Sequence, residues 1–279
     1  MRDIIRLMNI IIGIYVFILG TAFGSFALAM VDRMKANKDW VKGRSECDKC
    51  KHRLGPKDLV PLLSWLSTRG RCRYCKVKLS VAYPLTEILC GLAFTFSYIF
   101  LPYRTSEFSS TLGGALLLLW LLAIIIMTAL VVFDLRWFLL PNKLVYPLQV
   151  VALVHRILII TNNNQTITKD LITLGYTLMV SAGIFYLLHI VSKGKWIGDG
   201  DVRLGVAMGL FLPGPAEAWL AIFVASLSGV IIALPAIFKN KKALKMKLPF
   251  GPMLIFGLFV AFIFGSQLID WYNSTFLYI

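Results

Sequence analysis

ALLLLWLLAIIIMTALVVF, residues 115–133, is a run of nineteen amino acids without a single charge. About 20 apolar residues are enough for a helix to cross a bilayer, so this run predicts a transmembrane helix. A second run, IIIGIYVFILGTAFGSFALAM at residues 10–30, has the same character. Of the 279 residues 58% are hydrophobic and only 15% are charged, whereas a soluble domain has about a quarter charged residues. The sequence therefore predicts an all-α, polytopic integral membrane protein.

The apolar runs predict about eight spans, at 9–31, 83–102, 112–133, 142–160, 171–192, 203–213, 217–238 and 250–269. The sixth is too short to cross at 1.5 Å per residue unless it is tilted or crosses only in part. The first is too long for a signal-peptide core, so we expect it to be retained. The expected organisation is a first transmembrane helix in residues 1–31, a loop domain in 32–82 and a transmembrane core in 83–279.

Basic residues lie mostly in alternate loops, and this predicts the orientation of the chain. Of the 29 Lys and Arg, 24 fall in residues 32–82, 136–143, 193–203 and 239–247. Because cytoplasmic loops carry an excess of Lys and Arg, we expect these loops in the cytoplasm and both termini outside. Topology and attraction to the anionic lipid of the bilayer account for the net charge of +15, so no nucleic-acid partner is expected.

The loop 32–82 contains two C-x-x-C pairs, CDKC and CRYC. Disulfides are rare in the reducing cytoplasm, and two such pairs favour a four-thiolate zinc site. The predicted ligands are Cys47, Cys50, Cys72 and Cys75. Four protein ligands leave no open position on the metal, so we expect a structural Zn²⁺ that orders a loop with little core of its own. The alternatives are a redox pair or an incidental cluster, and His52 is a possible substitute for one thiol.

Two carboxyl groups lie at the ends of apolar runs, where a charge is costly. Asp134 directly follows residues 115–133, and Asp201 opens the sixth predicted span. An acidic group inside a span costs about 2.5–3.5 kcal/mol on insertion scales, so it tends to face a cavity or a partner. Both acids lie at predicted cytoplasmic helix ends and can meet at the same depth. Two facing carboxyls can share one proton, so that one acts as general acid while the other activates water, as in an aspartic protease.

Glycines flank the second acid in the segment GDGD. Their small size leaves room for an extended substrate strand close to the chain. The predicted active-site loop consists of Gly198, Asp199 and Gly200. The residues alone do not choose between Asp199 and Asp201 as the second catalytic acid. They also allow Asp134 to cap a helix or to bind Arg136, and GDGD to be a tight interfacial turn.

Six ordered motifs resemble those of the type IV prepilin peptidases, bifunctional enzymes of bacterial pilus, competence and type II secretion systems. The motifs are GTAFGSFALAMVDR (20–33), the cysteine loop with LVPLLSWLSTRGRCRYC (59–75), LSVAYPLTEILCG (79–91), FDLRWFLLPN (133–142), IGDGDVRLG (197–205) and LPFGPMLIFG (248–257). Together they extend along nearly the whole chain.

The resemblance implies an intramembrane aspartyl endopeptidase with Asp134 and Asp201 as its catalytic pair. Members of the family cut the basic leader from a prepilin or pseudopilin precursor just after a glycine, at the cytoplasmic face of the bacterial inner (plasma) membrane. They then methylate the new N-terminus, usually a phenylalanine, with S-adenosylmethionine as methyl donor. Glu87 fits a family glutamate, so we expect it to contact the substrate or the methyl donor, or to be hydrogen-bonded as part of the structure.

Two other classes of function fit parts of the pattern. A transporter would use embedded carboxylates as a proton relay, but it would need them near the middle of the membrane rather than at one edge. A non-enzymatic assembly platform would recruit a cytoplasmic partner through its zinc loop. The platform would not depend on Asp134 or Asp201.

Overall fold

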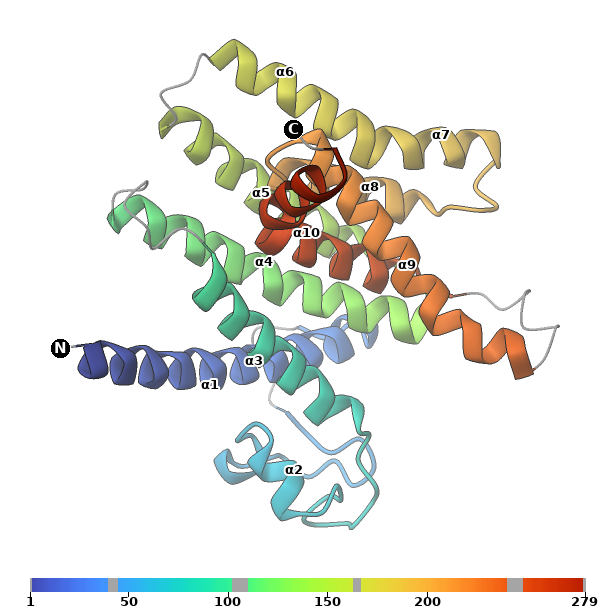
Figure 1. Ribbon diagram of the computed structural model, residues 1–279. Coiled ribbons are helices and arrows are strands. Elements are labelled where there is room, and N and C mark those ends of the chain that lie inside the picture. Colours follow the sequence, from blue (N-terminus) through green and yellow to red (C-terminus); the bar gives the residue numbers. More distant parts are fainter. Residues whose placement is uncertain (1, 40–44, 102–109, 163–166, 240–247, 278–279) are drawn as a thin grey trace. The chain divides into compact units, whose positions relative to one another are not determined.

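The computed structural model describes residues 2–39, 45–101, 110–162, 167–239 and 248–277 (Figure 1). Within these residues the fold is helical, with two isolated β-bridges and no strand. The predicted all-α class is confirmed. Contacts divide the chain into two compact units, Met1–Leu101 and Pro102–Ile279. The three-part division expected from the sequence stays a prediction.

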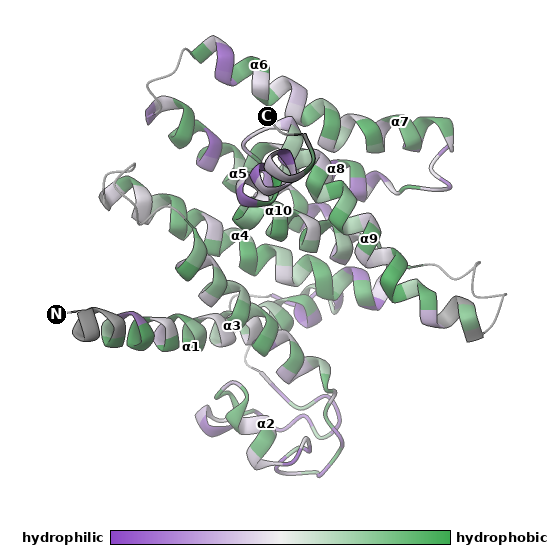
Figure 2. Cartoon of the chain, viewed as in Figure 1, coloured by the Kyte–Doolittle hydropathy of each residue, from purple (hydrophilic) through white to green (hydrophobic). Residues whose placement is uncertain are grey.

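Seven of the described helices are long and apolar enough to cross a membrane, and Figure 2 shows hydrophobic residues along them. The chain is therefore a multi-pass membrane protein. The predicted sixth span, 203–213, corresponds to α8 (Asp199–Phe211), which is not among the seven. Its 13 residues are too few to cross a hydrocarbon core of about 30 Å. Residues 240–247, part of the topology argument, lie outside the described residues.

In the first unit two helices pack along each other, α1 (Arg2–Lys35) and α3 (Ala82–Phe100). A Cβ added at Gly20 would lie 2.8 Å from the Cα of Gly91, so the two backbones nearly touch. Small residues allow this close approach of helices in membranes. The cysteine loop connects the two helices and contains the short helices η1 (Pro56–Asp58) and α2 (Leu63–Ser67).

The second unit contains the remaining helices, of which α6 and α7 are joined into one span by the π-helical turn η3. In chain order they are α4 (Ser110–Trp137), α5 (Asn142–Asn162), α6 (Ile167–Leu178), η3 (Met179–Gly183), α7 (Ile184–Val191), α8, α9 (Pro215–Lys239), α10 (Gly251–Tyr272) and η5 (Asn273–Leu277). Trp120 of α4 is fully buried, and its ring lies 3.8 Å from that of Phe262 and 5.2 Å from that of Phe211. This aromatic cluster joins α4, α8 and α10 in one core.

The short helix α8 packs closely against the π-helical turn. A Cβ added at Gly205 would overlap the carbonyl oxygen of Ser181, and one at Gly209 would overlap the hydroxyl oxygen of the same serine. Residues four apart lie on one face of a helix, so these two glycines form a single contact surface. The contact fixes the position of α8, whose first turn contains Asp201.

Replacing Gly205 with alanine should destabilise the protein by about 1–3 kcal/mol, because the new methyl group meets a backbone carbonyl. Thermal unfolding in detergent measures the effect. The matched control is Gly175→Ala in α6, where a Cβ would meet nothing within 4 Å. The control should be neutral or slightly stabilising, since alanine favours helix more than glycine does. Equal stability of the two variants would contradict the packing described here.

Candidate functional site

Asp134 lies near the end of α4 and is only 6% exposed. Its Oδ2 accepts a hydrogen bond of 2.9 Å from the backbone N–H of Gly251, the first residue of α10. A Cβ at Gly251 would lie 2.7 Å from the same oxygen, so only glycine lets the backbone approach the carboxyl this closely. This role of Gly251 was not predicted from the sequence, although a glycine between Phe250 and Pro252 is a local signal of a close backbone contact. The bond fixes the orientation of the Asp134 side chain.

Asp201 is the third residue of α8, and Gly198 directly precedes the helix in an extended conformation. The N–H of Gly198 donates to Asp201 Oδ2 at 3.2 Å, and the N–H of Asp201 donates to the Gly198 carbonyl at 3.1 Å. The predicted GDGD loop is therefore the beginning of a helix, closed by two reciprocal bonds. A Cβ at Gly200 would lie 2.9 Å from the Cβ of Leu140. Leu140, rather than open space for a substrate, thus fills the side-chain position at Gly200.

Asp134 and Asp201 interact electrostatically across the start of α8. Burial raises the pKa of Asp201, the N–H of Gly198 lowers it and the charge of Asp134 raises it, and together they bring it to about 6. Leu140 lies next to both acids, since it contacts the backbone at Gly200 and would meet a Cβ at Gly251 at 3.1 Å. Carboxyls from two helices, 67 positions apart in the sequence, thus lie near the same leucine.

Asp199 belongs to a separate polar cluster. Its carboxylate forms an ion pair with Arg203, one helical turn further on, and its side chain is 60% exposed. Arg203 also donates to Asn142 Oδ1 and to the hydroxyl of Tyr146 at 2.9 Å, while the side chain of Gln149 donates to the Arg203 carbonyl. These bonds hold the first turn of α8 against α5. This role of Arg203 was not predicted from the sequence, although an acid and an arginine four residues apart indicate an ion pair on one face of a helix.

Asp201 is ionised above its folded pKa of about 6, and burial of this charge should lower the free energy of unfolding at neutral pH. The pKa of Asp201 is about 6 in the folded protein, against an ordinary 3.8. The folded state therefore binds the proton more tightly, and the stability that this proton contributes below pH 3.8 is lost as the pH rises through 6. Asparagine resembles the neutral acid, so Asp201→Asn should raise the free energy of unfolding at pH 7.5 by about 1–2 kcal/mol, after allowance for partial exposure. The gain should shrink at pH 5. Thermal melts at both pH values measure it, and an equal gain at both would contradict this origin.

In the first unit, the four predicted zinc ligands form a cluster. One ligand atom from each of Cys47, Cys50, Cys72 and Cys75 lies within 4.8 Å of the others, and these cysteines are not disulfide-bonded. The Sγ atoms of Cys47 and Cys75 are 3.8 Å apart. Four sulfurs at 2.3 Å from a tetrahedral zinc would be separated by about 3.8 Å, so the spacing fits a metal. His52 is not part of this cluster, and its ring instead lies 3.6 Å from that of Tyr74.

The two C-x-x-C turns have the same backbone structure. In the first, Cys47 N–H donates to the carbonyl of His52 and Lys51 N–H donates to that of Cys47; in the second, Cys72 pairs with Val77, and Lys76 with Cys72, in the same way. A positive φ follows each pair, 56° at Lys51 and 58° at Lys76. Each turn thus directs two thiols to the same side, which explains how short segments supply four ligands.

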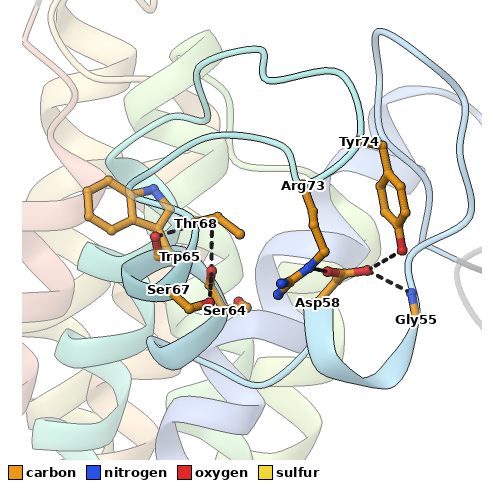
Figure 3. A network of polar contacts seen from close by, with 8 residues as sticks. All are labelled: Gly55, Asp58, Ser64, Trp65, Ser67, Thr68, Arg73 and Tyr74. Carbon is orange, nitrogen blue, oxygen red and sulfur yellow. Dashed lines mark hydrogen bonds and ion pairs between the residues drawn. The ribbon is translucent and has the colours of Figure 1, made fainter.

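A polar network around Asp58 links the segment between the two cysteine turns to the second turn (Figure 3). Arg73 Nε donates to Asp58 Oδ1 at 2.7 Å, and the hydroxyl of Tyr74 and the N–H of Gly55 donate to Oδ2, each at 3.1 Å. The hydrogen bond from Arg73 lowers the pKa of Asp58 below its ordinary value. Asp58 therefore stays ionised and ties the helical segment between the turns to the second pair of cysteines.

Glu87 lies in the first turns of α3, 5% exposed. Its Oε2 accepts the N–H of Leu62 at 2.7 Å. Leu62 directly precedes α2 and has an unusual backbone conformation, with φ of 60° and ψ of −52°. Glu87 therefore anchors the cysteine loop to the helix that follows it. Glu87 belongs to the first unit, whereas Asp134 and Asp201 belong to the second.

These features define a class of protein: a multi-pass membrane protein with a four-cysteine cluster in one helical unit and two interacting carboxyls in the other. Residues 18–101 match the bacterial peptidase A24 N-terminal domain, and residues 121–234 match the type IV leader peptidase family. The first match ends at Leu101, where the first unit also ends.

Similar proteins carry the name prepilin leader peptidase/N-methyltransferase. That of Aeromonas salmonicida (strain A449) is 30% identical over 84% of this chain and 76% of its own length. That of Bacillus subtilis (strain 168) is 27% identical over 92% of this chain and 96% of its own length. That of Legionella pneumophila is 31% identical over 82% of this chain and 75% of its own length. No solved structure is significantly similar to the chain.

The chain belongs to the type IV leader peptidase family. The family resemblance read from the six motifs is confirmed.

Proposed function

We propose that the chain is an intramembrane aspartyl endopeptidase in which Asp134 and Asp201 are the catalytic pair. The leader peptidase class follows from the family to which the chain belongs. The observation that carries the residue assignment is the position of Leu140, which packs against Gly200, the residue before Asp201, and against Gly251, whose N–H binds Asp134. The raised pKa of Asp201 supports a pair that holds one proton near neutral pH.

The pair performs acid–base catalysis on the scissile amide. The ionised carboxyl takes a proton from a water molecule, which attacks the amide carbon. The protonated carboxyl gives its proton to the departing amine. The N–H groups of Gly251 and Gly198 hold one oxygen of each acid, so the remaining oxygens are oriented before substrate arrives.

The substrate is a prepilin or pseudopilin precursor, cut at the end of its basic leader. The similar proteins' names support a prepilin substrate and an N-methyltransferase activity. The resemblance of the motifs implies that this activity methylates the new N-terminus, with S-adenosylmethionine as the methyl donor. We place the enzyme in the inner (plasma) membrane of a bacterium, with both termini outside. In this orientation Asp134 and Asp201 face the cytoplasm, as the distribution of Lys and Arg predicts.

The four cysteines hold a structural Zn²⁺. The supporting observations are the spacing of their sulfur atoms and the matched backbone of the two turns. Four thiolates fill a tetrahedral zinc, so the metal stabilises the loop and supplies no open position for chemistry.

A peptide assay tests the proposal. The purified protein is mixed with a synthetic peptide containing a basic leader, a glycine, a phenylalanine and an apolar segment. Mass spectrometry should find cleavage after the glycine and, with S-adenosylmethionine present, one added methyl group on the new N-terminal phenylalanine. If the peptide stays intact in the presence of folded protein reconstituted in lipid, the peptidase assignment is refuted.

A further inference from the structure

The loop that joins α7 to α8 is folded against the end of α7. Figure 1 shows the chain reversing its direction after α7, and α8 packs against α7. The N–H of Gly194 donates to the carbonyl of His189 at 2.8 Å, and the N–H of Lys193 donates to that of Ile190 at 3.0 Å. Lys193 and Gly194 both have a positive φ, of 51° and 75°. These bonds form a Schellman motif, which ends α7 and turns the chain back over its last turn.

The ring of His189 contacts both ends of this loop. A Cβ at Gly194 would lie 3.3 Å from Cε1 of the ring, so the backbone of the loop packs on the imidazole. At the far end of the loop, Nδ1 of His189 lies 2.8 Å from the carbonyl oxygen of Ile197. A carbonyl oxygen can only accept, so Nδ1 carries a hydrogen and donates it. Protonation of the other ring nitrogen leaves this donor in place, so the bond does not require a charge on His189.

The carbonyl that His189 binds belongs to the peptide group that joins Ile197 to Gly198. The N–H of the same group donates to Asp201 Oδ2 at 3.2 Å. In a trans peptide the C=O and the N–H lie in one plane and point in opposite directions, so a restraint on the oxygen also sets the direction of the N–H. A hydrogen bond accepted by the oxygen polarises the group and strengthens its N–H as a donor.

Gly198 makes this peptide group easy to rotate, because a residue without a Cβ has a wide range of backbone conformations. Such a rotation would turn the N–H away from Asp201 and release the carboxyl. The bond from the N–H of Asp201 to the carbonyl of Gly198 holds the next peptide group along the chain, so it does not prevent the rotation. The bond from His189 to Ile197 opposes it directly.

We propose that His189 is a positioning residue for the peptidase reaction, which acts through the Ile197–Gly198 peptide group on the carboxyl of Asp201. The inference rests on the proposed function, in which Asp201 is one of the two catalytic acids. His189 exchanges no proton with the substrate. It holds the peptide N–H on Oδ2 of Asp201, and the other carboxyl oxygen is thereby oriented for the reaction.

Steady-state cleavage of the leader-containing peptide by the full-length protein tests this role. His189→Leu removes the donor and keeps an apolar side chain of similar bulk, whereas the amide nitrogen of His189→Asn is bonded to Cγ as Nδ1 is, and restores a donor. Misplacement of a reacting group by about 1 Å can cost about 10²-fold, so kcat should fall about 10- to 100-fold in His189→Leu with KM unchanged. His189→Asn should recover most of this loss. Wild-type kcat in His189→Leu, or no recovery in His189→Asn, would overturn the proposal.

The pH dependence of cleavage distinguishes positioning of Asp201 from a general loosening of the loop. The N–H of Gly198 lowers the pKa of Asp201, against burial and the charge of Asp134. When His189→Leu weakens that bond, the pKa should rise, and the pH above which cleavage declines should move upward. The charged groups around Asp201 are the same in the variant and the wild type, namely Asp134, Asp199 and Arg203. An unmoved decline would contradict the role assigned to His189.

Ser192→Ala is the matched control within the loop. The hydroxyl of Ser192 accepts the N–H of Trp196 at 3.3 Å, so this variant also loses a hydrogen bond of the loop but keeps the bond from His189 to Ile197. Its cleavage should decline at the same pH as that of the wild type. A change equal to that of His189→Leu would assign the effect to loop order and refute positioning. Thermal unfolding in detergent reports that each variant is folded, and His189→Phe, a planar ring without a donor, replaces His189→Leu if leucine prevents folding.

Asp201→Asn, measured in the same assay, separates this inference from the proposed function. If Asp201→Asn is inactive while His189→Leu keeps the wild-type rate and pH dependence, the positioning role is refuted and the catalytic pair stands. If Asp201→Asn cleaves fully, the catalytic pair is refuted, and the role of His189 with it.

Discussion

Asp134→Asn and Asp201→Asn should each lower the rate of leader cleavage by about 10³-fold or more. A positioned acid or base contributes typically 10²–10⁴-fold, and asparagine can neither donate nor accept the shared proton. Both substitutions keep an oxygen for the backbone N–H that each acid binds, Gly251 or Gly198, so the fold should remain. Cleavage of the prepilin-like peptide, followed over time at saturating enzyme, measures the loss.

The matched control is Asp199→Asn, two residues from Asp201 but exposed and paired with Arg203. It should retain cleavage at its own optimum pH, because its carboxyl does not interact with Asp134 in the way that Asp201 does. Full cleavage by Asp134→Asn or Asp201→Asn would remove the catalytic assignment of these two residues. A wild type that does not cleave, with assembly intact in both variants, would favour the assembly platform. A wild type that does not cleave but carries an ion flux that both substitutions abolish would instead favour the transporter.

The second large effect concerns the metal. Cys72→Ser should reduce bound zinc from about one per chain to nearly none, because a serine hydroxyl is a poor substitute for a thiolate. Zinc contributes on the order of 10 kcal/mol to small metal-dependent folds, so the loop should lose its order. Elemental analysis of the purified protein measures the metal, and limited trypsin digestion at the many loop lysines and arginines measures the order.

Cys90→Ser is the control for this experiment. Cys90 is also buried, but it lies within α3 and is not part of the cluster of four. It should keep its zinc and its resistance to trypsin. A Cys72→Ser protein with full zinc content would show that the cluster does not bind the metal.

Local features of the sequence were enough to predict the helical class and the cysteine cluster. A charge-free run such as 115–133 has only one stable conformation in lipid, and C-x-x-C spacing places two thiols on one turn whatever surrounds it. The predicted number of spans, about eight, was less accurate than the helical class, because hydropathy does not distinguish a short buried helix from a spanning one. α8 is apolar because α5, η3 and α10 cover it, and it is too short to cross.

The details of the site depend on contacts between distant segments. The bond from Gly251 to Asp134 joins residues 117 positions apart, and no spacing rule in the sequence predicts it. The π-helical turn at Met179–Gly183 and its contact with Gly205 are likewise consequences of tertiary packing. For the same reason the interpretation of Gly200 as space for substrate was incomplete: the sequence shows the missing side chain but not Leu140, which fills its place.

The ion pair between Asp199 and Arg203 has a consequence for the proton held by the neighbouring acid. An arginine two residues after Asp201 is a potential counter-ion, and pairing with it would favour the charged form of that carboxyl. Asp199, Asn142 and Tyr146 together occupy the guanidinium and so divert it. Asp199 thus keeps Arg203 away from Asp201, so that the pKa of Asp201 stays raised. In an Asp199→Asn enzyme, the pH above which cleavage declines should move downward.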